Sequence, residues 1–321
     1  MNVFKILSLD GGGMKGVFSA AFLCALEEKL GKRTADYFDL VVGTSTGGII
    51  AIALGLGISA KDILDFYMSE GKHIFGNNGF VQRAIKGIRG LVSPRHDVRH
   101  LENALRNHFG DKRLGHSKTR LVIPSFNPAT GDVYLYKTAH HSTLKEDYKK
   151  LAREVARSTS AAPTYFSGNK IGLLTHLVDG GLWANNPSMV AVTEAIGLLG
   201  RSPEELALLS VGTSSSQLSV PEKTRSSGGL LRWAWTMKDL FMHVQSITAH
   251  KQASNVLRRS GRYVRIAPIG SDLSIRMDDP KEALTLIPFG ERAARNSRSK
   301  VENMFFAARA PEFVPEYTLT L

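Results

Sequence analysis

The 321-residue sequence contains one cysteine, Cys24, so no disulfide can form within the chain. No run of about 18 apolar residues is present, and we therefore expect no membrane-spanning helix. There is no His-Glu-x-x-His motif and no cysteine pair, so we expect no metal cofactor. The N-terminus shows no secretory signal, which makes a cytoplasmic protein the expectation.

Charge of one sign is in excess, because 41 lysines and arginines face 29 aspartates and glutamates, for a formal net charge of +12. Such a balance favours contact with phosphate groups on anionic lipid, nucleotides or nucleic acid. No RNA- or DNA-binding motif accompanies the charge, so we expect no nucleic-acid polymer as partner. Hydrophobic residues make up 43% of the chain, enough for a sizeable core.

Apolar strand and helix patterns alternate in the first part of the chain. Val3–Leu9 reads as a buried strand, Val17–Leu30 as a helix and Tyr37–Val42 as a second strand that leads into another helix. This alternation predicts an α/β fold of three layers, with a mainly parallel central sheet and helices on both faces. Further strands are expected at Arg120–Phe126, Asp132–Lys137 and Glu205–Val211, and further helices at Ala60–His73, Asp147–Ser158, Pro187–Leu199, Leu230–Arg258 and Glu291–Ala310.

No convincing linker or internal repeat interrupts the chain, which predicts a single domain with insertions. Within it we expect residues 1–215 to form the catalytic core. Residues 216–321 are expected to form a helical continuation of the same domain that can have a regulatory role. The polar, Gly/Ser-rich stretch Pro221–Gly229 is predicted to be a mobile loop.

The sequence Gly43-Thr44-Ser45-Thr46-Gly47 lies between an apolar strand and an apolar helix. This placement is typical of a nucleophile elbow, in which a sharp turn projects the serine hydroxyl beside the positive end of the helix. The alternative is a turn of small residues that only packs helix against strand. The strand before it and the helix after it favour Ser45 as a nucleophile.

A glycine-rich stretch, Asp10 to Gly16, follows the first strand. Gly11, Gly13 and Gly16 fit a dinucleotide-binding fingerprint, but the next strand then leads into the Ser45 turn instead of ending in a ribose-binding acid. The other interpretation is an oxyanion hole, in which the amides of Gly11, Gly12 and Gly13 point at a carbonyl oxygen that becomes an anion. We favour the oxyanion hole.

A serine nucleophile needs a base. Asp179, followed by Gly180 and Gly181, ends a short apolar run and is the best candidate, although Asp-Gly turns are common without any catalytic role. A histidine relay through His243 or His250 is the rival, since it would keep the Ser, Asp, His order of α/β-hydrolases. Both histidines lie in a helical stretch, without a turn to aim them.

These three motifs together resemble the patatin-like phospholipase family. The glycine loop, the Gly43–Gly47 elbow and the Asp179–Gly181 turn match its pattern, and the stretches Ser158–Phe166 and Trp183–Pro187 are also similar to it. The family often has arginine where this chain has Lys15. Lysine keeps the positive charge but lacks the planar, forked guanidinium group of arginine. The resemblance implies a patatin-like α/β fold and a Ser45–Asp179 dyad that cleaves acyl esters of phospholipids and galactolipids without calcium or histidine.

Access to a bilayer is expected to involve the segment Phe80–Val92. On a helix, its apolar residues would fall on one face and its basic residues on the other, an arrangement typical of peripheral contact with the inner membrane surface. A helix packed on the core with a solvated basic face is the alternative. Gly87 and Gly90 would let the segment move.

The C-terminal third contains a basic stretch whose charge suits a phosphodiester ligand. Its residues are Lys251, Arg258, Arg259, Arg262 and Arg265. The size and layout of the chain also resemble bacterial patatin-like effectors of antiphage signalling, which implies a cyclic dinucleotide activator, with Arg258 and Arg259 as candidate contacts. The alternatives are a constitutive esterase and a non-catalytic nucleotide-binding module that uses the Gly11–Gly16 loop. The sequence leaves a homo-oligomer open.

Overall fold

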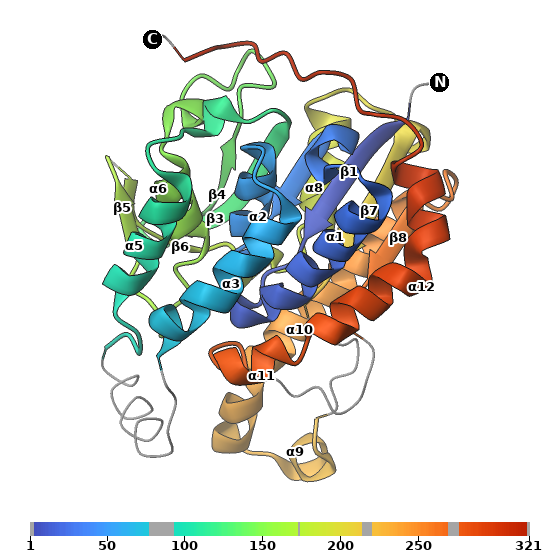
Figure 1. Cartoon of the computed structure of the whole chain (residues 1–321). Helices are drawn as coiled ribbons and strands as arrows, with labels where there is room; N and C mark the ends of the chain where they lie inside the picture. Colours follow the sequence, from blue (N-terminus) through green and yellow to red (C-terminus); the bar gives the residue numbers. More distant parts are fainter. Residues whose placement is uncertain (1–2, 77–92, 173, 214–219, 269–275, 320–321) are drawn as a thin grey trace.

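The computed structural model describes residues 3–76, 93–172, 174–213, 220–268 and 276–319, and its centre is a single sheet (Figure 1). Among the described residues the strand order is β5-β6-β3-β2-β1-β7-β8, and β4 also pairs with β3. The strands are β1 (Phe4–Leu9), β2 (Leu40–Gly43), β3 (Arg120–Asn127), β4 (Asp132–Lys137), β5 (Asn169–Ile171), β6 (Leu174–Asp179), β7 (Leu206–Val211) and β8 (Tyr263–Ile266).

The middle of the sheet, from β3 through β2, β1 and β7 to β8, is parallel, whereas β4, β5 and β6 pair in antiparallel fashion. Side chains of β1 alternate between two cores, with Leu7 and Leu9 on one face and Phe4 and Ile6 on the other. Strands buried on both faces are typical of a parallel sheet between helices.

Helices cover both faces of the sheet. They are α1 (Gly16–Leu30), α2 (Thr46–Gly55), α3 (Ala60–Phe75), α5 (Val98–Phe109), α6 (Ala152–Thr159), α7 (Gly181–Ala184), α8 (Ser188–Gly197), α9 (Glu222–Ser227), α10 (Leu230–Val256), α11 (Pro280–Leu284) and α12 (Ile287–Phe305). The core on one face receives side chains from α1, α2, α3, α5, α6, α11 and α12, and the core on the other face from α8 and α10. Figure 1 shows α1, α3 and α12 in front of the strands and α8 behind them. The predicted three-layer α/β fold is confirmed.

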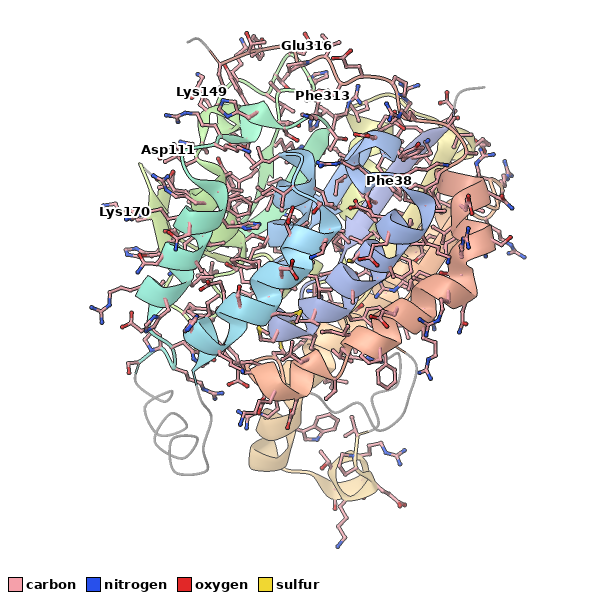
Figure 2. All side chains as sticks on the ribbon, viewed as in Figure 1. Phe38, Asp111, Lys149, Lys170, Phe313 and Glu316 are labelled. Carbon is pink, nitrogen blue, oxygen red and sulfur yellow. The ribbon has the colours of Figure 1, made fainter. Side chains whose placement is uncertain are left out.

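The C-terminal part of the chain completes this core. β8 extends the sheet beyond β7, and α12 packs along α1. Phe38, next to β2, stacks on Phe305 of α12 with ring centroids 5.6 Å apart. Figure 2 shows Phe38 inside the body, whereas Asp111 and Lys149 point outward. The two ends of the sequence therefore share one hydrophobic core.

Two predicted elements are wrong. The stretch Pro221–Gly229 is not simply a loop, because Glu222–Ser227 forms α9, which starts after Pro221 and has an acidic residue in its first turn. The predicted helix Asp147–Ser158 is interrupted: Asp147–Lys149 forms a 3-10 turn, and Lys150 and Leu151 are extended before α6 begins. The Lys150 carbonyl accepts a hydrogen bond from the Leu114 amide, which holds this segment against its neighbour.

None of the helices in the described ranges has the length and apolar character needed to cross a bilayer. The predicted amphipathic segment Phe80–Val92 lies outside the described residues.

Candidate active site

Ser45 occupies a strained turn between β2 and α2. Its backbone has φ 55° and ψ −123°, a conformation that costs a residue with a side chain about 1–3 kcal/mol. Neighbouring contacts hold the turn, since the Ser45 amide donates to Thr159 Oγ1 at 2.9 Å and Thr44 Oγ1 donates to the Ala184 carbonyl at 2.6 Å. Strain maintained in this way is typical of functional sites.

The glycines on either side of Ser45 are required by close backbone approach. A Cβ on Gly43 would collide with the carbonyl oxygen of Gly47, and a Cβ on Gly47 would collide with the carbonyl oxygen of Leu9. Both obstacles are backbone atoms, which cannot move aside as a flexible side chain would. The Gly-x-Ser-x-Gly spacing is therefore a steric condition for this turn.

The Ser45 hydroxyl donates a hydrogen bond of 2.6 Å to Asp179 Oδ2. The other carboxyl oxygen, Oδ1, accepts a bond of 2.7 Å from the Gly181 amide, and both Ser45 and Asp179 are buried. Gly180 lies so close to the Pro124 carbonyl that a Cβ there would collide with it. The turn after β6 thus needs a glycine at position 180, and the Gly181 amide helps to aim Asp179 at Ser45.

Burial raises the pKa of the Asp179 carboxyl from its ordinary value of 3.8 to about 7, while the hydrogen bonds from Ser45 and Gly181 lower it in part. Desolvation disfavours the charged form of an acid. A carboxylate with a pKa near neutrality is a much stronger base than an exposed one, which suits it to accept a hydroxyl proton.

The glycine loop after β1 faces the same space. The Gly11 amide donates to the Asn185 carbonyl at 2.8 Å, so this amide is already engaged and cannot serve as an oxyanion donor in this arrangement. For Gly12 and Gly13, no amide acceptor is found in the described part of the chain. Gly13 has a left-handed φ of 59°, and a Cβ there would meet the Met277 carbonyl.

The remaining predicted loop residues lie at the start of α1. Lys15 is half-buried and precedes the first residue of the helix, Gly16. A Cβ on Gly16 would collide with the Thr46 side chain, so this glycine allows α1 to approach the serine turn closely.

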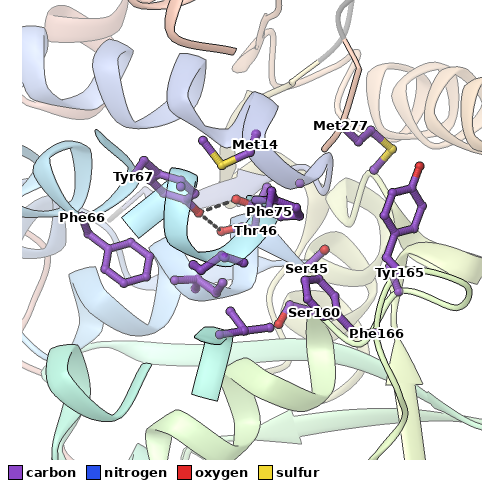
Figure 3. A pocket seen from close by; sticks show the side chains of 16 residues that line it. Met14, Ser45, Thr46, Phe66, Tyr67, Phe75, Ser160, Tyr165, Phe166 and Met277 are labelled. Atoms are coloured by element: carbon purple, nitrogen blue, oxygen red, sulfur yellow. Dashed lines mark hydrogen bonds between the residues drawn. The ribbon is translucent and has the colours of Figure 1, made fainter. Parts of the chain in front are cut away.

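A pocket with apolar walls opens beside Ser45 (Figure 3). Gly13 and Ser45 lie on its wall, so the glycine loop and the serine share one cavity. Its large apolar side chains come from the glycine loop, α2, α3, α5 and the segments around Tyr165 and Met277; they are Met14, Ile49, Phe66, Ile74, Phe75, Leu101, Phe166 and Met277. Figure 3 also shows Tyr67 bonded to Thr46, next to Ser45.

The two histidines proposed for a relay are placed on α10. His250 Nδ1 lies 2.7 Å from the Tyr263 hydroxyl. The two carboxyl oxygens of Asp179 are bonded to the Ser45 hydroxyl and the Gly181 amide rather than to a histidine. Within the described ranges, no group of three His, Cys, Asp or Glu side chains is arranged to hold a metal ion.

The predicted basic stretch divides in two. Arg258 and Arg259 are exposed just beyond α10, and Lys251 is exposed on it. Arg265 does not belong with them, because it forms a two-pronged ion pair with buried Asp10, with distances of 2.8 and 2.5 Å. Burial raises the pKa of Asp10, although the Arg265 charge opposes this rise. A buried carboxylate needs such a partner, which the sequence alone does not reveal.

Several residues that hold the site in place were not predicted from the sequence. The Thr159 hydroxyl accepts a hydrogen bond from the Ser45 amide and donates one of 2.6 Å to the Pro124 carbonyl. Asn185 bonds the Gly11 amide. Thr159 lies in the stretch Ser158–Phe166 and Asn185 in the stretch Trp183–Pro187. The similarity of these stretches to the family could have indicated that they belong to the site. Gln245 of α10, which bonds the Asn185 amide, had no such signal.

Comparison with known proteins identifies the family of the chain. The family model described as patatin-like phospholipase matches residues 7–192. A cGAMP-activated phospholipase of Pseudomonas aeruginosa is 31% identical over 245 residues, which cover 75% of this chain and 72% of that protein. The Vibrio cholerae protein of the same description is 32% identical over 251 residues, covering 72% and 70%. Patatin-like protein 2 of Oryza sativa subsp. indica is 34% identical over 220 residues, covering 60% and 53%. This chain belongs to the patatin-like phospholipase family.

Proposed function

We propose that the protein hydrolyses acyl esters of membrane phospholipids, with Ser45 as nucleophile and Asp179 as base. The observation that carries the proposal is the 2.6 Å bond from the Ser45 hydroxyl to a buried carboxyl whose pKa is about 7, at the wall of an apolar pocket. A nucleophile within hydrogen-bond reach of its base is the required geometry.

In the first half of the reaction, Ser45 Oγ attacks the ester carbonyl while its proton passes to Asp179 Oδ2. The C–O bond to the leaving alcohol then breaks, and Asp179 returns the proton to that alcohol. In the second half, Asp179 takes a proton from water, whose oxygen attacks the acyl-enzyme. Fatty acid leaves when the Ser45 oxygen recovers the proton.

The amides of Gly12 and Gly13 are the proposed donors to the oxyanion, and Gly11 is the residue that anchors them. One such donor stabilises the transition state by about 3 kcal/mol. Because the oxyanion would be stabilised by amides, the proposal requires neither calcium nor another metal. The fatty acyl chain would occupy the apolar pocket, where Phe66, Phe75 and Phe166 exclude water.

Control by a cyclic dinucleotide is the second part of the proposal. It is supported by the two relatives described as cGAMP-activated phospholipases and by the exposed pair Arg258 and Arg259 after α10. Arginine forks match phosphate oxygens well. The proposed setting is antiphage defence at the inner membrane surface, where an unrestrained phospholipase would damage its own cell.

Release of fatty acid from phospholipid vesicles tests both parts. Wild-type protein should be nearly silent alone, and one member of a panel of cyclic di- and trinucleotides should raise its rate by orders of magnitude, equally in EDTA. Charge reversal at Arg258 and Arg259 should weaken the response. High basal release that no cyclic nucleotide alters would leave a constitutive lipase. Absence of release under every condition would contradict the hydrolase itself.

A further inference from the structure

Asn185 joins the two halves of the site through its backbone. Its carbonyl accepts the 2.8 Å bond from the Gly11 amide, at the start of the glycine loop. It also lies at the end of the turn and short helix, α7, that follow Asp179. The position of the Asn185 backbone therefore relates the loop that carries the proposed oxyanion donors to the turn that carries the base.

Gln245 of α10 holds the backbone of Asn185 on its amide side. Its Oε1 accepts a hydrogen bond of 2.5 Å from the Asn185 amide, and its Nε2 donates one of 3.0 Å to the Leu182 carbonyl. One side-chain amide thus bridges α7 and the residue that follows it. The pairing needs an acceptor and a donor on the same group, which glutamine supplies and a carboxylate or an ammonium does not.

The neighbouring residue strengthens the attachment. The Ser246 carbonyl accepts a 3.1 Å bond from Asn186 Nδ2, and Arg265, the partner of Asp10, lies 3.5 Å from Ser246 Oγ. α10 is therefore bonded both to the turn after Asp179 and, through Arg265, to the residue that precedes Gly11.

We infer that Gln245 is a positioning residue for the hydrolytic reaction, although it lies outside residues 7–192, which match the family model. It acts by fixing the backbone of Asn185 through its N–H, and the carbonyl of the same residue in turn fixes Gly11 and so the directions of the Gly12 and Gly13 amides. The inference rests on the proposed function of Ser45 and Asp179. Small misplacements of catalytic groups are costly, with about 1 Å worth as much as a hundredfold in rate.

A merely structural Gln245 would only attach α10 to the body of the protein. Its loss would then lower the melting temperature and the fraction of active molecules, without changing the rate of each active molecule. A positioning role predicts the opposite: a lower kcat per active site with an unchanged KM, because the apolar pocket is untouched.

The test uses full-length Gln245→Met, which keeps the length of the side chain and removes both hydrogen bonds. A fluorophosphonate titration gives the number of active sites. kcat and KM are measured on a soluble short-chain ester with the activating cyclic nucleotide of the vesicle assay present, because the protein alone is proposed to be nearly silent. We expect kcat per site to fall about tenfold to a hundredfold, with KM within about twofold of wild type and phosphonylation of Ser45 slowed in parallel. Thr248→Ala, at an exposed position on the same helix, is the control and should match wild type.

If Gln245→Met does not fold, Gln245→Asn replaces it, because its shorter amide cannot reach Asn185. Gln245→Glu should recover part of kcat, since it keeps an acceptor for the Asn185 amide. A wild-type kcat per site in Gln245→Met or Gln245→Asn overturns the inference. Ser45→Ala distinguishes a failure of the proposed function from a failure of the positioning role. If that variant stays active, the proposed function fails, whereas if it is inactive and the Gln245 variants are normal, only the positioning role fails.

Discussion

Asp179 at the end of β6 pairs with Ser125 of β3. Slightly earlier on β3, Val122 pairs with Val42 of β2. β4 runs along β3 over the same residues, so it occupies the opposite edge and leaves β2 and β6 on a common edge. β2 is parallel to β3 and β6 is antiparallel, so their carboxyl ends approach one another. The turn that carries Ser45 and the turn that carries Asp179 thus meet because of strand direction and register.

The pH dependence of hydrolysis should report Asp179. Only its ionised form can accept the Ser45 proton, so kcat/KM on a soluble ester should fall tenfold per pH unit as the pH drops below about 7. A profile measured on both sides of neutrality checks this. An inflection near 3.8, the ordinary value for an aspartate, would show that burial does not tune this carboxyl.

Asp179 should also make the folded protein less stable at neutral pH. Its folded pKa of about 7 lies above the unfolded value of 3.8, so its contribution to stability is present below 3.8 and is lost as the pH rises through about 7. Asp179→Asn should therefore gain stability relative to wild type over this window, by a few kcal/mol at most. Urea unfolding at a pH below and a pH above this window measures the difference, and a gap that does not change with pH would refute the assignment.

Histidine should be dispensable for turnover. Asp179→Asn should lose on the order of 10³-fold in kcat, because an amide cannot take the serine proton. His250→Ala removes the bond to Tyr263 and should cost about 1 kcal/mol of stability with little change in kcat. His243→Ala should be similarly active. A histidine variant as inactive as Asp179→Asn would replace the dyad with a triad.

The elbow glycines should be intolerant of any side chain. Gly47→Ala places a Cβ against the Leu9 carbonyl, so we expect a loss of about 2 kcal/mol or more and a displaced Ser45. Gly197→Ala is the matched control, because it lies at the exposed end of α8 with open space around it. That change should be neutral or stabilise the protein by up to ~1 kcal/mol. Equal effects of the two substitutions on unfolding by urea would contradict the steric argument.

The sequence predicted the local parts of the site well. The elbow around Ser45 and the turn at Asp179 each have a local sequence signature, namely an apolar strand followed by a turn with glycines, and this signature is visible in the sequence itself. The contacts that require Gly47 and Gly180, with the Leu9 and Pro124 carbonyls, join distant segments and are not visible there. The bond between Ser45 and Asp179 followed from the family resemblance and could not be derived from spacing, since it depends on strand order.

Contacts between distant segments were not predictable. Arg265 looked like part of a surface basic stretch, yet it neutralises Asp10, because β8 pairs with β7 and turns this side chain inward. The Gly11 amide looked free and is bonded to Asn185. Charge and glycine content indicate what a residue can do, whereas its partner is set by the tertiary fold. The division at residue 215 and the roles of Arg258 and Arg259 remain predictions.

The central claim is that Asp179 activates Ser45. The most direct measurement is the rate at which a fluorophosphonate modifies the protein, with the modified peptide identified by mass spectrometry. Wild type and Ser19→Ala, which removes a buried hydroxyl of α1 without a hydrogen-bond partner in the described part of the chain, should be modified at equal rates. We predict one adduct, on Ser45, no adduct in Ser45→Ala, and a rate in Asp179→Asn lower by on the order of 10³-fold. An adduct on another residue, or an unchanged rate in Asp179→Asn, would contradict the account.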